Sequence, residues 1–163
     1  MKDKTTVLAL YPNRFGVAYA LFDSPTDLIE YGIGSISTLN HNKCTQRIKQ
    51  YIDYYKPDII ITRNLIDLKR RKSKRIEKLI GAICKEAKTQ NMKVYNYTRT
   101  QIKSVFETFK ATTKYKISQK LIEWFPQLRF YEFPSRDQWM AEHYNAGVFD
   151  AASLAVVHWF ERG

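Results

Sequence analysis

The residues with the clearest chemistry in this chain are cations crowded into one short stretch. Lys and Arg total 27 against 16 Asp and Glu, for a net charge of +11, and aromatic residues make up 14% of the chain. Cations release counterions from phosphates and aromatic faces stack on unpaired bases, so this composition indicates a nucleic-acid-binding protein. Clustering favours a phosphate-binding patch over a merely solvated surface. The run comprises Lys69, Arg70, Arg71, Lys72, Lys74 and Arg75.

Three other residues stand where a sheet-based enzyme would present reactive groups. Tyr11 follows an apolar run and precedes a Pro-Asn turn, and reactive side chains often lie where a strand ends in a loop. Asp150 is expected at the start of the last helix, where the helix dipole stabilises a carboxylate. His143 lies seven residues earlier, within loop reach of that helix start, and a histidine can activate water or bind a metal.

The apolar pattern that must position these groups predicts an α/β fold. Three antiparallel strands are followed by helix, strand, helix, strand and terminal helices, which gives a five-stranded mixed sheet flanked by helices. This order is that of the ribonuclease H fold. Without a linker or low-complexity tract, residues 1–163 are expected to form one domain. The strands are expected over about 7–11, 17–22, 28–37, 58–62 and 93–97, and the helices over about 43–55, 74–90, 101–106, 115–125 and 149–160.

Cysteine usage and hydropathy suggest a cytoplasmic protein. Cys44 and Cys84 fall on apolar stripes of expected helices, where they would be reduced core residues. The chain shows no signal-peptide pattern, and no apolar run approaches the ~18 residues of a membrane span. We therefore expect a cytoplasmic protein without a membrane partner.

Three segments resemble the C-terminal half of the RuvC family of Holliday junction resolvases. They are VYNYTRTQIKSVF at 94–106, KYKISQKLIEWFP at 114–126 and FDAASLAVVHW at 149–159. In that family a strand and a Q-V-K segment precede a basic helix, and an acidic D-A-A-D-A-L-A helix closes the active site. The hairpin at the N-terminus likewise resembles the family's I-D-P-G strand and turn.

The chain departs from this family at the catalytic positions. The family's chemistry uses carboxylates to hold two divalent ions, which activate water and stabilise the leaving oxygen. The resemblance places Tyr11, Arg63, Asp150 and Ser153 at those positions, so that one carboxylate of four is retained. A phenol and a guanidinium are poor ligands for Mg²⁺. We expect no cofactor and no metal site, with Asp150 only a weak candidate ligand.

The resulting hypothesis is a RuvC-like pseudoenzyme that binds nucleic acid without cutting it. Arg63 is expected to pair with Asp150 and take over the neutralising role of the ions. The partner would be DNA, branched or duplex, or RNA, and the resemblance implies a homodimer. Trp139 is the best candidate for base stacking. Phosphate contacts are expected from the basic run 69–75 and from Lys103, Lys114 and Lys116, of which Lys103 and Lys114 fall at positions that are basic in the resembled family.

Three alternatives remain open. The first is a divergent structure-specific endonuclease, a Holliday junction resolvase with a Mg or Mn site rebuilt from other acids or His143. The second is a protein-interaction scaffold. The third is an ATP-dependent phosphotransferase of the actin and sugar-kinase type, which needs a second such domain and a glycine where Asn13 stands. The acids considered for a rebuilt site are Asp23, Asp67 and Glu142.

Overall fold

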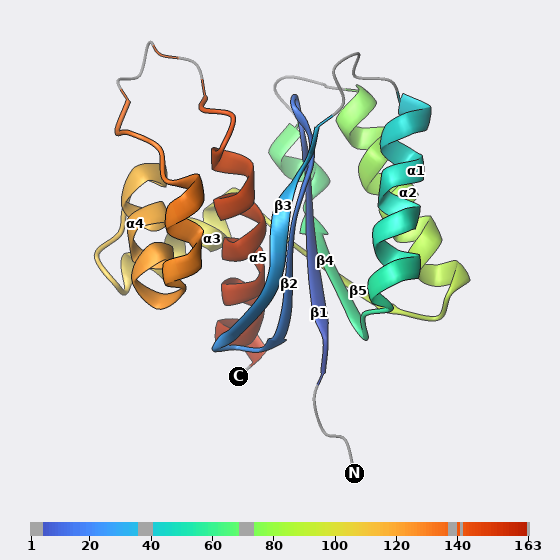
Figure 1. The fold of residues 1–163 in the computed structure, drawn as a ribbon, viewed down its shortest axis with the longest axis horizontal. Helices are drawn as coiled ribbons and strands as arrows, with labels where there is room; N and C mark the ends of the chain where they lie inside the picture. The colour runs from blue at the N-terminus through green and yellow to red at the C-terminus, as the bar shows by residue number, and fades with distance from the viewer. Residues whose placement is uncertain (1–4, 36–40, 69–73, 137–139, 141, 163) are drawn as a thin grey trace.

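The computed structural model describes residues 5–35, 41–68, 74–136, 140 and 142–162. A five-stranded sheet in the order β3-β2-β1-β4-β5 lies between two layers of helices. Helices α1 and α2 cover one face, and α3, α4 and α5 cover the other (Figure 1). The elements are β1 (Val7–Asn13), β2 (Gly16–Ser24), β3 (Asp27–Ser35), α1 (His41–Tyr55), β4 (Ile59–Arg63), η1 (Leu65–Leu68), α2 (Lys74–Thr89), β5 (Lys93–Tyr97), α3 (Arg99–Glu107), α4 (Lys114–Trp124), η2 (Pro126–Tyr131) and α5 (Ala146–Arg162).

The predicted mixed sheet is confirmed. β1 pairs antiparallel with β2 and parallel with β4, and β4 pairs parallel with β5. Leu10 lies opposite Thr62 in the β1–β4 register. The next residues along these parallel strands are Tyr11 and Arg63, so the register brings both side chains to the same edge of the sheet.

Strand β1 is buried on both faces. Val7, Ala9 and Tyr11 belong to the core between the sheet and α3–α5. Leu8 and Leu10 belong to the core between the sheet and α1–α2. This two-sided burial explains why the strand is a continuous apolar run instead of an alternating one.

The turn between β1 and β2 packs against the start of α5. The backbone N–H of Phe15 donates to the Asn13 side-chain oxygen at 2.8 Å, and Gly16 adopts φ 141°, which favours glycine. A Cβ at Gly147 would lie 2.7 Å from the Asn13 amide nitrogen and 3.0 Å from the Ala18 Cβ. The absence of a side chain at 147 therefore lets α5 pack directly against the hairpin.

The element boundaries differ from expectation mainly around α5. The helix begins at Ala146 instead of about 149, so Asp150 lies in its second turn and not at its first residue. The short 3₁₀ helix η2 directly follows α4, where the sequence predicted no helix. Cys44 is a buried core residue, as predicted. Several predictions fall outside the described residues, namely those on Lys69, Arg70, Arg71, Lys72 and Trp139. Within the described chain, no helix is both long and apolar enough to span a membrane.

Candidate functional site

A cleft of about 690 Å³ opens beside the ends of β1 and β4. Five of the site residues predicted from the sequence line it, namely Tyr11, Arg63, Lys103, Lys114 and His143. Its charged lining holds five cations and two carboxylates among the described residues. The lining comprises Tyr11, Arg63, Asp67, Arg99, Lys103, Thr112, Thr113, Lys114, Tyr115, Phe133, Ser135, Arg136, Glu142, His143 and Ala146.

Tyr11 and Arg63 stack on each other at the sheet edge. The Arg63 guanidinium carbon lies 4.3 Å from the centroid of the Tyr11 ring, within the range of a cation–π interaction. Its Nη1 donates to the carbonyl of Pro12 at 2.7 Å, while its buried Nε has no hydrogen-bond partner among the described residues. The predicted pairing of Arg63 with Asp150 is therefore wrong, because the tyrosine ring and a backbone carbonyl engage this guanidinium instead.

Two other cations neutralise Asp150. The Arg99 Nη1 lies 3.1 Å from one oxygen of its carboxylate, and the Lys114 Nζ lies 3.4 Å from the other. Lys114 also forms an ion pair with Glu142. The Asp150 side chain is only 5% exposed, so both cations act on a nearly desolvated carboxylate. The ammonium group of Lys114 thus lies between two carboxylates, a position that a divalent metal ion could otherwise take.

Both cations occupy the first residue of a helix. Thr98 caps α3: its hydroxyl accepts from the backbone N–H of Gln101 at 3.1 Å, and the Gln101 side chain accepts from the Thr98 N–H at 2.8 Å. The Thr113 hydroxyl caps α4 by accepting from the backbone N–H of Lys116. Because these caps fix the first residues of α3 and α4, they also fix the backbone positions from which Arg99 and Lys114 reach Asp150.

Arg99 was missed by the sequence-based reasoning, although a signal was present. The spacing T-x-x-Q at 98–101 is a capping-box pattern, which predicts a helix beginning at Arg99. The backbone N–H of Arg99 also donates to both oxygens of Asp67, at 3.2 and 2.9 Å. Asp67, considered above as a metal ligand, therefore helps to hold the start of α3. Arg136 is a further lining cation that the sequence did not single out.

The remaining predicted residues divide into those that reach the cleft and those that do not. Lys103 and His143 line it. The Ser153 hydroxyl is buried and donates to the Asp150 carbonyl at 2.7 Å within its own helix. Lys74 and Lys116 are exposed, and Lys116 follows the cap of α4. Arg75 is half-buried and donates to the Asn13 carbonyl at 3.2 Å.

The electrostatics of the cleft keep Tyr11 protonated and Lys114 charged. Burial raises the pKa of Tyr11 to about 12, and the Asp150 carboxylate acts in the same direction. The neighbouring cations oppose this effect without cancelling it. Burial lowers the pKa of Lys114, but Asp150 and the other acidic neighbours raise it by more, so that its net pKa is raised. The cleft therefore holds a neutral phenol beside fixed positive charges.

The raised pKa of Tyr11 predicts a loss of stability in alkali. Its folded pKa of about 12 exceeds the ordinary value of 10, so the stabilising contribution is complete below pH 10 and disappears as the pH rises toward 12. Between pH 10 and pH 12, the free energy of unfolding in urea should fall by about 2 to 3 kcal/mol less for Tyr11→Phe than for the parent protein. Tyr19, whose pKa is also raised to about 12, accounts for part of the remaining decline. An equal decline in both proteins would contradict the assignment.

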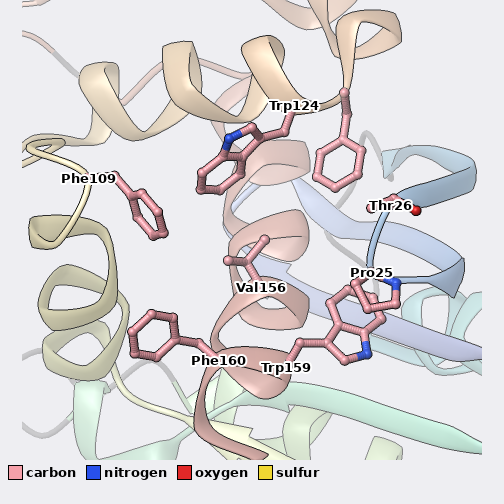
Figure 2. Close-up of a pocket in the computed structure, with 8 residues that line it drawn as sticks. Pro25, Thr26, Phe109, Trp124, Val156, Trp159 and Phe160 are labelled. Carbon is pink, nitrogen blue, oxygen red and sulfur yellow. The ribbon is translucent and has the colours of Figure 1, made fainter. Parts of the chain in front are cut away.

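A second cavity, of about 480 Å³, offers no comparable chemistry. It lies between α4, the chain after α3, the β2–β3 turn and the C-terminal half of α5, and Figure 2 shows the rings of Phe109, Trp124 and Phe160 around it. Among the residues that the structure describes, its lining carries no charged side chain. It includes the aromatic rings of Trp124, Phe125, Trp159 and Phe160.

Comparisons with known proteins identify the fold. No protein-family model and no curated protein sequence matches the chain. Among solved structures, RuvC from Thermus thermophilus in complex with a Holliday junction substrate matches with a TM-score of 0.69 and 13% identity, covering 97% of this chain and 94% of that one. The chain has a RuvC-like fold. A second structure of Thermus thermophilus RuvC matches with the same TM-score and 12% identity, over 96% of this chain and 95% of that one.

The residues in the cleft do not fit the two-ion site that the sequence resemblance implies. Tyr11 and Arg63 are stacked, the Ser153 hydroxyl is used within its helix, and Asp150 is already paired with two cations. The described residues contain no group of three or more His, Cys, Asp and Glu side chains placed to hold a metal ion. Glu142 and His143 both line the cleft, but Glu142 forms an ion pair with Lys114. The His143 ring stacks on the Phe133 ring, with the two ring centroids 5.8 Å apart.

Proposed function

We propose that this RuvC-like chain binds nucleic acid through the cleft at the ends of β1 and β4 without hydrolysing it. The observation that carries the proposal is the pairing of Asp150 with Arg99 and Lys114, in a cleft where five cations face two further carboxylates. The excess of cations favours a polyanion. The same cations disfavour divalent ions, which would have to displace ammonium and guanidinium groups from a buried carboxylate.

The backbone of the nucleic acid is the group that this chemistry would recognise. Arg63, Lys103 and Arg136 line the cleft outside the Asp150 ion-pair network and add positive charge to it, although Arg63 also stacks on Tyr11 and Arg136 donates to the Met140 carbonyl. Arginine offers several N–H donors in a planar fork that matches phosphate oxygens. The Thermus thermophilus RuvC structure holds a Holliday junction, which supports branched DNA as one ligand to test. RNA and a homodimer remain predictions of the same proposal.

The test is a binding and cleavage assay on duplex, branched and single-stranded DNA and RNA, with and without Mn²⁺. We expect binding at low salt and intact substrates under every condition. Tyr11→Asp should also leave them intact, because Arg63 and Ser153 still occupy the other positions implied by the resemblance. Mn²⁺-dependent cutting that disappears in Asp150→Ala would instead support the endonuclease alternative. Absence of binding to every substrate at low salt would favour the protein-interaction scaffold.

A further inference from the structure

An aromatic pair joins the tip of the β1–β2 hairpin to the segment before α5, close in the chain to residues of the cleft. The Phe15 and Tyr144 rings lie 5.2 Å apart, edge to face, and join the hairpin to the segment before α5. Phe15 is half-buried, whereas Tyr144 is 38% exposed. Tyr144 follows His143, which lines the cleft, and the hairpin carries the Pro12 carbonyl to which the cleft residue Arg63 donates. The pair is therefore next to cleft residues along the chain, and neither ring belongs to the buried core clusters.

The guanidinium of Arg14 lies over the Phe15 ring of this pair. The Arg14 guanidinium carbon lies 5.0 Å from the centroid of the Phe15 ring, and Arg14 is exposed. A guanidinium on an aromatic face is a planar group that a nucleobase can replace, because every base has a π face that stacks on phenylalanine. Once displaced, the guanidinium remains beside the ring, where it can pair with a flanking phosphate.

We infer that Phe15 and Tyr144 form a stacking platform for an unpaired base, and that Arg14 neutralises the adjoining phosphate. The inference rests on the proposed function and specifies its substrate class: nucleic acid with an unpaired base beside the backbone held in the cleft. A base within an intact duplex stacks on its neighbours and cannot reach the rings without being extruded. Single-stranded or gapped nucleic acid is therefore favoured over continuous duplex.

The experiment compares a continuous duplex, a gapped duplex with one unpaired base, and the same gap with an abasic residue. Affinity is measured by fluorescence anisotropy, and stacking by the quenching of 2-aminopurine at the unpaired position. For the gapped duplex, Phe15→Ala and Tyr144→Leu should each lower affinity, by between about 5- and 150-fold. Replacing the unpaired base by an abasic residue should weaken binding of the parent protein by a similar factor. The same replacement should change the affinity of Phe15→Ala very little, because the base and the ring act as one pair.

Two controls separate stacking from a general loss of folding or charge. Phe15→Tyr keeps an aromatic ring and should retain affinity and quenching. Tyr54→Ala removes an aromatic ring that is 81% exposed on α1, which covers the face of the sheet opposite α3–α5. This variant should change neither the affinity nor the 2-aminopurine quenching. Equal losses on continuous and gapped duplexes, or no loss in either variant, would overturn the platform while leaving nucleic-acid binding intact. Failure of the parent protein to bind any of these ligands at low salt would overturn both proposals.

Discussion

Lys114→Met should lower the free energy of unfolding at pH 7 by about 3 kcal/mol, the lower end of the range for removing one partner of a buried ion pair. The Asp150 carboxylate would keep only Arg99, and Glu142 would lose its cation. The lower end applies because the Lys114 side chain is 32% exposed. The measurement is urea unfolding of the parent protein and the variant under the same conditions.

A matched lysine in the same helix provides the control. Lys120 forms an ion pair with Glu123, whose side chain is 65% exposed, so Lys120→Met should cost less than about 0.5 kcal/mol. The double variant Lys114→Met, Asp150→Asn should recover much of the stability, because it removes the uncompensated carboxylate together with its partner. Equal effects of Lys114→Met and Lys120→Met would contradict the ion-pair network described for the cleft.

Nucleic-acid affinity should fall on the order of 10³- to 10⁵-fold between 50 and 200 mM salt if six to ten phosphates are contacted. The physical reason is counterion release, which depends on how many cations lie against the backbone. Lys103→Gln should reduce the slope of log affinity against log salt by about 1, since this lysine lines the cleft. The slope is obtained by titrating one labelled oligonucleotide at several salt concentrations.

The control for the salt experiment is Lys49→Gln. Lys49 lies on α1, away from the cleft, and forms ion pairs with Asp53 at 3.4 Å and Glu86 at 3.5 Å. Its loss should leave the slope unchanged. A flat salt response of the parent protein would count against phosphate contacts altogether, and equal changes for both variants would remove the cleft as their location.

The strand order could be predicted from the sequence because its signals are local. The isoleucines of β4 and the apolar run of β1 indicate strands buried on both faces, and such strands belong in the parallel part of an α/β sheet. The convergence of Tyr11, Arg63 and Asp150 was an expectation from the resemblance. Tyr11 and Arg63 line the cleft, and Asp150 pairs with the lining residues Arg99 and Lys114. The start of α5 was placed too late because Ala146 and Gly147 carry little helix-start signal.

The partners within the site could not be predicted in the same way. Asp150 is separated by 51 residues from Arg99 and by 36 from Lys114, so no local spacing links them. Arg63 was expected to reach Asp150 because both positions are implied by the resemblance. The sequence does not show that the Tyr11 ring offers a flat aromatic surface beside Arg63, nor that the Pro12 carbonyl offers an acceptor.

The close packing at Gly147 has a consequence for the thermodynamics of binding. Its α-carbon carries no side chain, and a Cβ there would meet the Asn13 amide at 2.7 Å, so the end of the hairpin next to its turn and the first turn of α5 are in direct contact. Phe15 lies in that turn and Tyr144 lies two residues before α5, so the two rings come from segments joined at this contact. We expect the contact to limit how far the rings separate before a ligand arrives. A preorganised surface loses less conformational entropy on association, so more of the stacking energy is expressed as affinity.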